Sequence, residues 1–171
     1  MFEGAQGLGL DQELGHFPHV TRSRTGLPNI SVLMNRSGLK DKAPLWAIYV
    51  TRTYATRHGA GPLSDEDKWD SSLVLIDNTN QTNEWQGEFR YAPINFSERS
   101  DWIQQDLQRI PTEVAVEPSL AITHMDQVPE FPMEMEIELR KIDRFEAGFG
   151  LPIEMVSYGP TAEDIDIRLI V

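Results

Sequence analysis

The stretch that decides the predicted fold is residues 44–57, PLWAIYVTRTYATR. Aromatic and β-branched residues dominate it, and these residue types favour strands over helices. Its side chains alternate between two faces, one of which carries Trp46, Ile48, Val50, Arg52 and Tyr54. The stretch therefore predicts a long β-strand.

The same two-residue period recurs along the chain. It predicts strands in residues 29–35, 112–117, 119–125, 133–140, 153–158 and 163–171, and a hairpin from 72–76 and 85–91 around the polar turn 77–83. Turn signals separate these runs. The sequence therefore predicts a mainly β fold, an antiparallel β-sandwich or barrel of about eight or nine strands with one packed α-helix.

That helix is predicted at residues 98–110. Ser97 can cap its free amide groups, and Pro111 forbids its continuation. Asp101 in the first turn and Arg109 in the last turn both match the helix dipole.

A glycine- and proline-rich leader precedes the predicted strands. Residues 1–28 show neither a helical nor a strand period, so we predict an N-terminal arm (1–28) and a single β-rich domain (29–171). The segment from Gly4 to Gly9, GAQGLG, is similar to a phosphate loop, but its spacing is wrong and no predicted strand precedes it. A flexible leader is the favoured interpretation.

Composition and charge exclude several classes of function. Cysteine is absent, which excludes disulfides, thiolate metal sites and cysteine nucleophiles. The net charge of −12 argues against sequence-independent binding to nucleic acid. Residues 1–60 hold seven basic and four acidic residues, a net charge of +3, so the other 111 residues carry −15. This split favours association between a basic segment and an acidic body.

The first residues have no basic region followed by an apolar one, and no run of about 18 apolar residues occurs. We therefore expect neither a signal peptide nor a membrane span. The predicted location is the cytoplasm on synthesis, with incorporation into a virion as a further expectation.

No motif identifies a catalytic or metal site. His16 and His19 lie near Asp11 and Glu13, but their spacing is loose. The acidic run from Asp65 to Asp70 lacks the pattern of a calcium loop and indicates a solvated loop. No nucleophile motif is found. We therefore predict no catalytic residue, no metal and no cofactor.

The favoured hypothesis is a structural, non-enzymatic protein that assembles head to tail into rings or tubes, as in a phage tail, neck or baseplate. Its partners would be copies of itself and other assembly proteins, with no direct contact to nucleic acid or membrane. An acidic adaptor or inhibitor of a basic protein is the alternative, and a small-molecule or carbohydrate enzyme on a β scaffold is the third. The predicted interface consists of Phe2, Leu8, Leu10, Phe17, Val20, Arg22 and Arg24.

Overall fold

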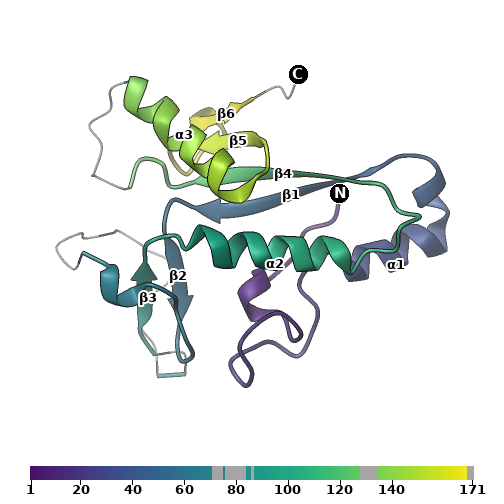
Figure 1. The fold of residues 1–171 in the computed structure, drawn as a ribbon, viewed down its shortest axis with the longest axis horizontal. Helices are drawn as coiled ribbons and strands as arrows, with labels where there is room; N and C mark the ends of the chain where they lie inside the picture. The colour runs from purple at the N-terminus through teal and green to yellow at the C-terminus, as the bar shows by residue number, and fades with distance from the viewer. Residues whose placement is uncertain (71–74, 76–83, 86, 128–134, 169–171) are drawn as a thin grey trace. The chain divides into compact units, whose positions relative to one another are not determined.

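The computed structural model describes residues 1–70, 75, 84–85, 87–127 and 135–168, and only the backbone of 135–141 (Figure 1). Its helices are α1 (Pro28–Ser37), α2 (Phe96–Gln108) and α3 (Met135–Phe149). Its strands are β1 (Leu45–Arg52), β2 (Ala55–His58), β3 (Phe89–Ala92), β4 (Val116–Thr123), β5 (Ile153–Ser157) and β6 (Ile165–Ile167). Four short 3-10 helices complete the set, η1 (Leu8–Leu10), η2 (Leu39–Asp41), η3 (Glu66–Lys68) and η4 (Ala162–Asp164).

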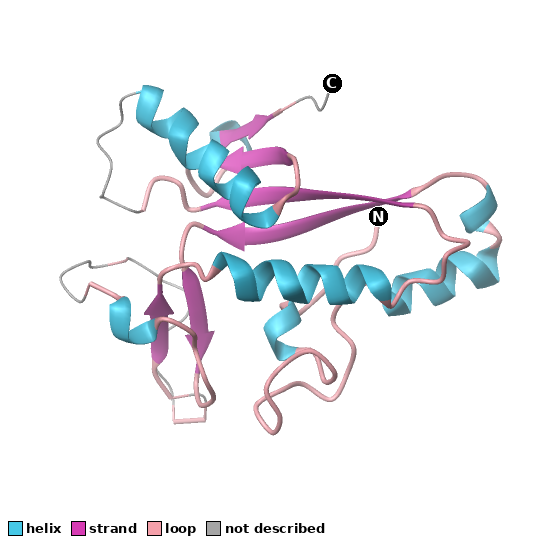
Figure 2. Cartoon of the chain, in the orientation of Figure 1, coloured by secondary structure: helices cyan, strands magenta, loops and turns pink. Residues whose placement is uncertain are grey.

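The fold is mixed α/β, as Figure 2 shows by colour. One sheet has the strand order β1-β4-β5-β6, and a second sheet contains β2 and β3. β4 and β5 are parallel, whereas β5 and β6 are antiparallel. The predicted antiparallel sandwich or barrel is therefore wrong, and the described strands form no closed barrel. The physical reason is that α3 lies between β4 and β5 in the chain, and such a crossover allows parallel pairing.

The chain divides into two compact units. Unit 1 contains residues 1–47 and 98–118, and unit 2 contains residues 48–97 and 119–171. Leu27, Met34, Ile103, Ile110 and Val114 are buried in unit 1. The most deeply buried side chains of unit 2 are Leu120, Ile122 and Val156. The predicted boundary at residue 28 is not tested by this division and stays a prediction.

α1 replaces the strand predicted for residues 29–35, so that prediction is wrong. Pro28 occupies the first turn, where its missing N–H is not needed. Gly38 ends the helix in the left-handed conformation, with φ of 68°, and its amide donates back to Asn35 and Met34. The apolar pattern of this short segment fits either a helix or a strand. Pro28 at its start and Gly38 at its end favour the helix.

α3 replaces the strand predicted for residues 133–140, of which 133–134 lie outside the described residues. Beyond residue 140 the buried positions are Ile142, Phe145 and Phe149, whose spacing of three and four residues is helical. Gly150 then ends the helix at φ of 66°. The strand prediction is wrong because it stops before this spacing begins.

Other elements follow the sequence closely. The strand predicted at 44–57 is confirmed over Leu45–Arg52 as β1, but residues 55–57 belong to a second strand, β2, in the other sheet. The helix predicted at 98–110 is confirmed as α2, although α2 begins before Ser97. β5 confirms the strand at 153–158, and β6 lies within the predicted 163–171. β4 runs through Pro118, which is tolerated because pairing with β5 begins at Leu120. No described helix is long and apolar enough to cross a membrane.

Candidate anion-binding site

The tip of the β2–β3 hairpin brings two arginines together. β2 and β3 lie side by side (Figure 1) and pair in antiparallel register. This register sets Arg57 opposite Arg90 and His58 opposite Phe89. The sequence instead predicts a hairpin between residues 72–76 and 85–91. Among the described residues β3 pairs with β2. Residues 72–74 and 76 lie outside the described residues, so the predicted hairpin stays a prediction.

The loop after β2 holds both guanidinium groups by its carbonyl oxygens. Arg57 donates from Nε to the Ala60 carbonyl at 2.9 Å, and Arg90 donates from Nη2 to the Gly61 carbonyl at 2.5 Å. Gly59 and Gly61 have φ of 80° and 105°, values that favour glycine. The loop backbone thus fixes where the two charges lie.

Electrostatics distinguish the two arginines. Burial, followed by the nearby charge of Arg90, lowers the pKa of Arg57. Arg90 also forms an ion pair with Glu66, with Nη1 and Oε2 2.8 Å apart. The repulsion between the guanidinium groups would be relieved by an anion, and a guanidinium fork matches a phosphate group well.

Two further nitrogen atoms have hydrogen-bonding capacity left at this hairpin. Nε of Arg90 and Nε2 of His58 are buried and have no hydrogen-bond partner among the described residues. Such atoms are uncommon, because burying a polar group without a partner is costly. The His58 ring is held edge-on to Phe89, with ring centroids 5.5 Å apart.

An aromatic cluster supports the hairpin. Trp69 stacks on Tyr91 with ring centroids 5.7 Å apart and an interplanar angle of 23°, and Tyr54 lies 6.0 Å from each of them. The Arg52 guanidinium lies over Tyr54 and Phe89 at 5.8 and 5.7 Å. Stacked rings of this kind are rigid, so they hold Arg52 close to the hairpin.

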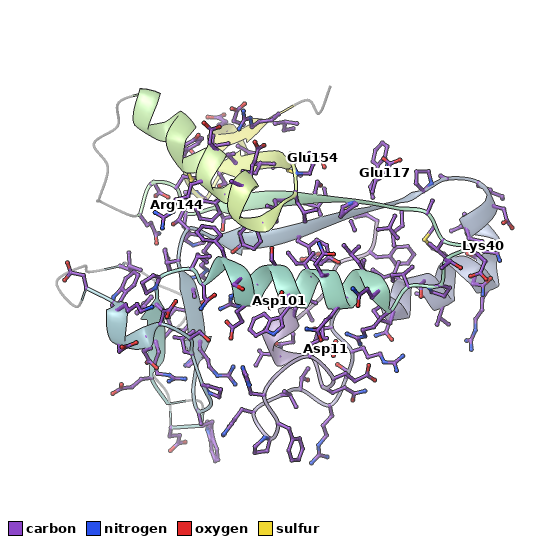
Figure 3. The ribbon with its side chains drawn as sticks, viewed as in Figure 1. Asp11, Lys40, Asp101, Glu117, Arg144 and Glu154 are labelled. Carbon is purple, nitrogen blue, oxygen red and sulfur yellow. The ribbon has the colours of Figure 1, made fainter. Side chains whose placement is uncertain are left out.

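In unit 1, the segment after η1 is tied down by a buried carboxylate, Asp11 (Figure 3). Asp11 accepts hydrogen bonds from the Glu13 amide at 2.9 Å and the Thr25 amide at 2.6 Å, and Arg109, which directly follows α2, lies 3.4 Å from it. Burial alone would raise the pKa of Asp11, but these hydrogen bonds and the Arg109 charge outweigh it and lower the pKa. The carboxylate therefore stays charged at neutral pH.

A second buried carboxylate, Asp106 on α2, holds the end of the same segment. Both of its oxygen atoms accept the Leu27 amide, at 3.2 and 3.1 Å. Gly26 packs directly against the carboxylate, so that a Cβ at this position would overlap it. Asp11 and Asp106 together fix residues 11–27 on α2 within unit 1.

The predicted interface residues lie in this N-terminal segment and differ in exposure. Phe2 and Phe17 are exposed, whereas Leu8, Leu10 and Val20 are half-buried. Arg22 is exposed, and Arg24 pairs with Glu13 at 2.8 Å. The interface stays a prediction.

The carboxylates and histidines considered for metal binding are placed apart. His16 lies near Glu98 at 3.8 Å, and Asp65 accepts hydrogen bonds from Lys68 and Asn95. No group of three metal-ligating side chains occurs among the residues that the structure describes.

Sequence reasoning misses the functional features named above. Residues 57–61, RHGAG, indicate only a strand end and a loop. The two glycines that closely follow Arg57 are a usable signal, because they mark a turn next to a basic residue. Asp11 and Asp106 give no signal, because buried and exposed carboxylates look alike in a sequence.

The model of the adenylosuccinate synthetase family matches residues 1–133. The chain belongs to the adenylosuccinate synthetase family. It is 30% identical over 126 residues to the adenylosuccinate synthetase of Acinetobacter baylyi and 34% identical over 128 residues to that of Clostridium beijerinckii. Each alignment covers 74% of this chain but 28% and 27% of the relative, so the chain spans about a quarter of the length of these synthetases.

A solved structure has the same fold. The cyanophage S-2L succinoaminodeoxyadenylate synthetase (PurZ), bound to dGMP and to dATP as an energy donor, superposes with a TM-score of 0.58 at 16% identity. The similarity covers 96% of this chain and 45% of PurZ.

Membership of the adenylosuccinate synthetase family corrects the predicted function. A ring- or tube-forming structural protein of a virion is wrong, and so is the prediction of no enzymatic role, because the family consists of synthetases. The acidic adaptor fails for the same reason. An enzyme on a β scaffold fails because the fold is mixed α/β.

Proposed function

We propose that this chain is a purine-nucleotide-binding part of an adenylosuccinate synthetase-like enzyme that acts in purine nucleotide biosynthesis. The observation that carries the proposal is the family match over residues 1–133, which includes both arginines of the hairpin. Such synthesis would take place in the cytoplasm, the location predicted from the sequence.

The hairpin arginines support binding of a nucleotide phosphate. Arg57 and Arg90 lie opposite one another, and the lowered pKa of Arg57 reflects, after burial, the charge of Arg90. Bringing a phosphate dianion to this pair would offset that repulsion. The donors with no partner among the described residues, Nε of Arg90 and Nε2 of His58, are available to the same ligand.

A deoxyribonucleotide is a second candidate for the substrate. The PurZ structure contains dGMP, and it is similar to 96% of this chain. The adenylosuccinate synthetase relatives instead favour a ribonucleotide. Comparing the affinities of the chain for dGMP and for GMP distinguishes a deoxyribonucleotide substrate from a ribonucleotide substrate.

The test is calorimetric titration of the whole chain with dGMP, GMP and deoxyguanosine. We expect both monophosphates to bind and Arg57→Gln to weaken this binding about 10- to 100-fold, because a hydrogen bond to a charged group contributes roughly 1.5–3 kcal/mol. Arg57→Lys should restore part of the affinity, since it keeps the charge without the fork.

The matched control is Arg36→Gln, which removes an exposed arginine at the end of α1 in unit 1. It should leave the affinity unchanged. If deoxyguanosine binds as tightly as dGMP, or if Arg57→Gln binds like the wild type, the arginine pair does not hold the phosphate. If no purine nucleotide binds at millimolar concentration, the proposed function of these residues is wrong.

A further inference from the structure

The Glu66 carboxylate already occupies one of the two arginines of the candidate anion-binding site. Its Oε2 accepts a hydrogen bond from Nη1 of Arg90 at 2.8 Å. Arg90 lies opposite Arg57 in the hairpin, so the three side chains bring together two positive charges and one negative charge. The arginine pair therefore holds an anion that the chain itself supplies, and this anion offsets only half of the positive charge.

The contact between Glu66 and Arg90 can open at low cost. The Glu66 side chain is 40% exposed and the Arg90 side chain 25%. Ion pairs with such access to water contribute little, because water solvates the separated charges well. Arg90 is also held without Glu66, since its Nη2 donates to the Gly61 carbonyl and its strand is paired with β2. The carboxylate can therefore turn into solvent while the arginine stays in place.

The backbone around Glu66 is anchored independently of its carboxylate. Asp65 accepts a hydrogen bond from Lys68 at 2.7 Å with one carboxylate oxygen and from Asn95 at 3.2 Å with the other. The Trp69 amide donates to the Glu66 carbonyl at 3.1 Å. Asp65 has φ of 64°, a conformation that is costly for a residue with a side chain and persists where its surroundings enforce it. Opening of the ion pair would thus move the Glu66 side chain and leave the loop fixed.

We propose that Glu66 is an internal competitor for the phosphate group that binds at the arginine pair. Its carboxylate holds Arg90 in the unliganded chain and moves into solvent when phosphate oxygens take its place. The exchange is favourable because a phosphate dianion brings a second negative charge to the two arginines, which a single carboxylate cannot supply. The inference rests on the proposed function and adds to it a residue that sets the affinity of the site.

The test is calorimetric titration of the whole chain and of its Glu66→Gln variant with inorganic phosphate and with dGMP. We expect the variant to bind both ligands about two- to fivefold more tightly, the range that corresponds to loss of a partly exposed ion pair. If Glu66 instead served to position Arg90 for the ligand, its removal would weaken binding. The direction of the change therefore separates competition from positioning.

The matched control is Asp67→Asn, which removes the same charge from the next residue, an exposed one. It should leave the affinity close to that of the wild type, because an exposed charge acts on the site through solvent and is screened. An equal gain in both variants would overturn the proposal, since net charge alone would explain it. Glu66→Asp is a second variant, which keeps the charge on a shorter side chain. It should also bind phosphate more tightly than the wild type, because the shorter side chain holds Arg90 less well.

Carbon-13 labelling of the glutamate carboxyl groups observes the exchange directly. The Glu66 signal is the one that both Glu66 variants lack. We expect this signal to shift in the wild type as phosphate saturates the chain. A signal that stays unchanged at saturation would show that Glu66 keeps its partner, and would overturn the proposal even where a variant fails to fold.

The outcomes distinguish this inference from the proposed function. If the wild type binds dGMP and Glu66→Gln binds it no more tightly, competition is wrong and nucleotide binding stands. If only the variant binds phosphate, competition is supported. If neither the wild type nor the variant binds phosphate or dGMP at millimolar concentration, the proposed function is wrong and the inference falls with it.

Discussion

Asp11 makes the stability of unit 1 depend on pH. Its pKa is lower in the folded chain than its ordinary value of 3.8, because amide hydrogen bonds and Arg109 outweigh the effect of burial. A carboxyl group with a lowered pKa stabilises the fold fully above its ordinary pKa, and this contribution is lost as the pH falls through the folded pKa. The charged form is the one that Arg109 and the two amides bind.

The variant Asp11→Asn should therefore lower the free energy of unfolding at pH 7 by about 1–3 kcal/mol, since it leaves Arg109 without this charged partner. The difference from the wild type should shrink as the pH falls below about 4. Urea unfolding at a series of pH values measures both effects. Asp101→Asn, an exposed change on α2, is the control. A difference that stays constant down to about pH 2 would contradict the lowered pKa.

Gly26 is required by the close approach of Asp106. A Cβ at this position would overlap the buried carboxylate that receives the Leu27 amide. Gly26→Ala should therefore cost about 1–3 kcal/mol, which corresponds to a lower Tm by roughly 2–12 °C in a chain of this size. Gly7→Ala is a matched control, because an added Cβ there would have no other atom within 4 Å. Equal Tm values for the two variants would show that the segment can shift away from α2.

At the scale of elements, the C-terminal end of α3 depends on one backbone conformation. Gly150 has φ of 66°, and its amide donates to the Glu146 carbonyl at 2.8 Å. A Cβ there would meet no neighbouring atom, so the cost of Gly150→Ala is conformational strain of about 1 kcal/mol. Gly150→Asn should cost less, because asparagine tolerates this conformation. Thermal unfolding of both variants tests whether alanine destabilises the chain more than asparagine does. A Gly150→Ala variant as stable as the wild type would refute this prediction.

Elements whose local signals agree are predictable from the sequence. β1 combines β-branched and aromatic residues with strict alternation, and α2 is followed by Pro111. α1 and α3 are missed because short apolar runs fit either period, and their glycine end signals also fit turns. The β2–β3 pairing is missed because residues 59–88 separate the strands, and a two-residue period does not specify a distant partner.

The candidate site is predictable only in part. The strand carrying Arg57 follows from the sequence, but the cross-strand register that brings Arg90 to it is a tertiary property. The same holds for Asp106, whose partner Leu27 lies 79 residues away. Residue type alone does not show which of 27 acidic residues is buried.

At the scale of the whole molecule, the structure changes the expected result of removing residues 1–28. The sequence alone predicts that residues 29–171 remain folded without the arm and assemble poorly. Asp11 and Leu27 are buried in unit 1, so their removal would leave Asp106 and Arg109 without these partners. We expect the truncated chain to unfold at a lower temperature. A calorimetric scan measures this, and an unchanged Tm would support the prediction from the sequence.

Self-association through the N-terminal third stays a prediction. Sedimentation of the full chain at several salt concentrations tests it, because attraction between exposed charges weakens as salt rises. A monomer at low salt and high protein concentration would exclude it.

The discontinuity of unit 1 has a consequence for protein synthesis. Residues 1–47 leave the ribosome first, but their unit is completed only by residues 98–118. The Leu27 amide can bond to Asp106 only after 79 further residues have been translated, which takes roughly 4–16 s at about 5–20 residues per second. During that interval the nascent N-terminal segment exposes apolar groups such as Leu27 and Met34, which are buried in the finished fold. Chaperone binding to ribosome-bound chains should therefore peak before residue 106 emerges and decline after residue 118.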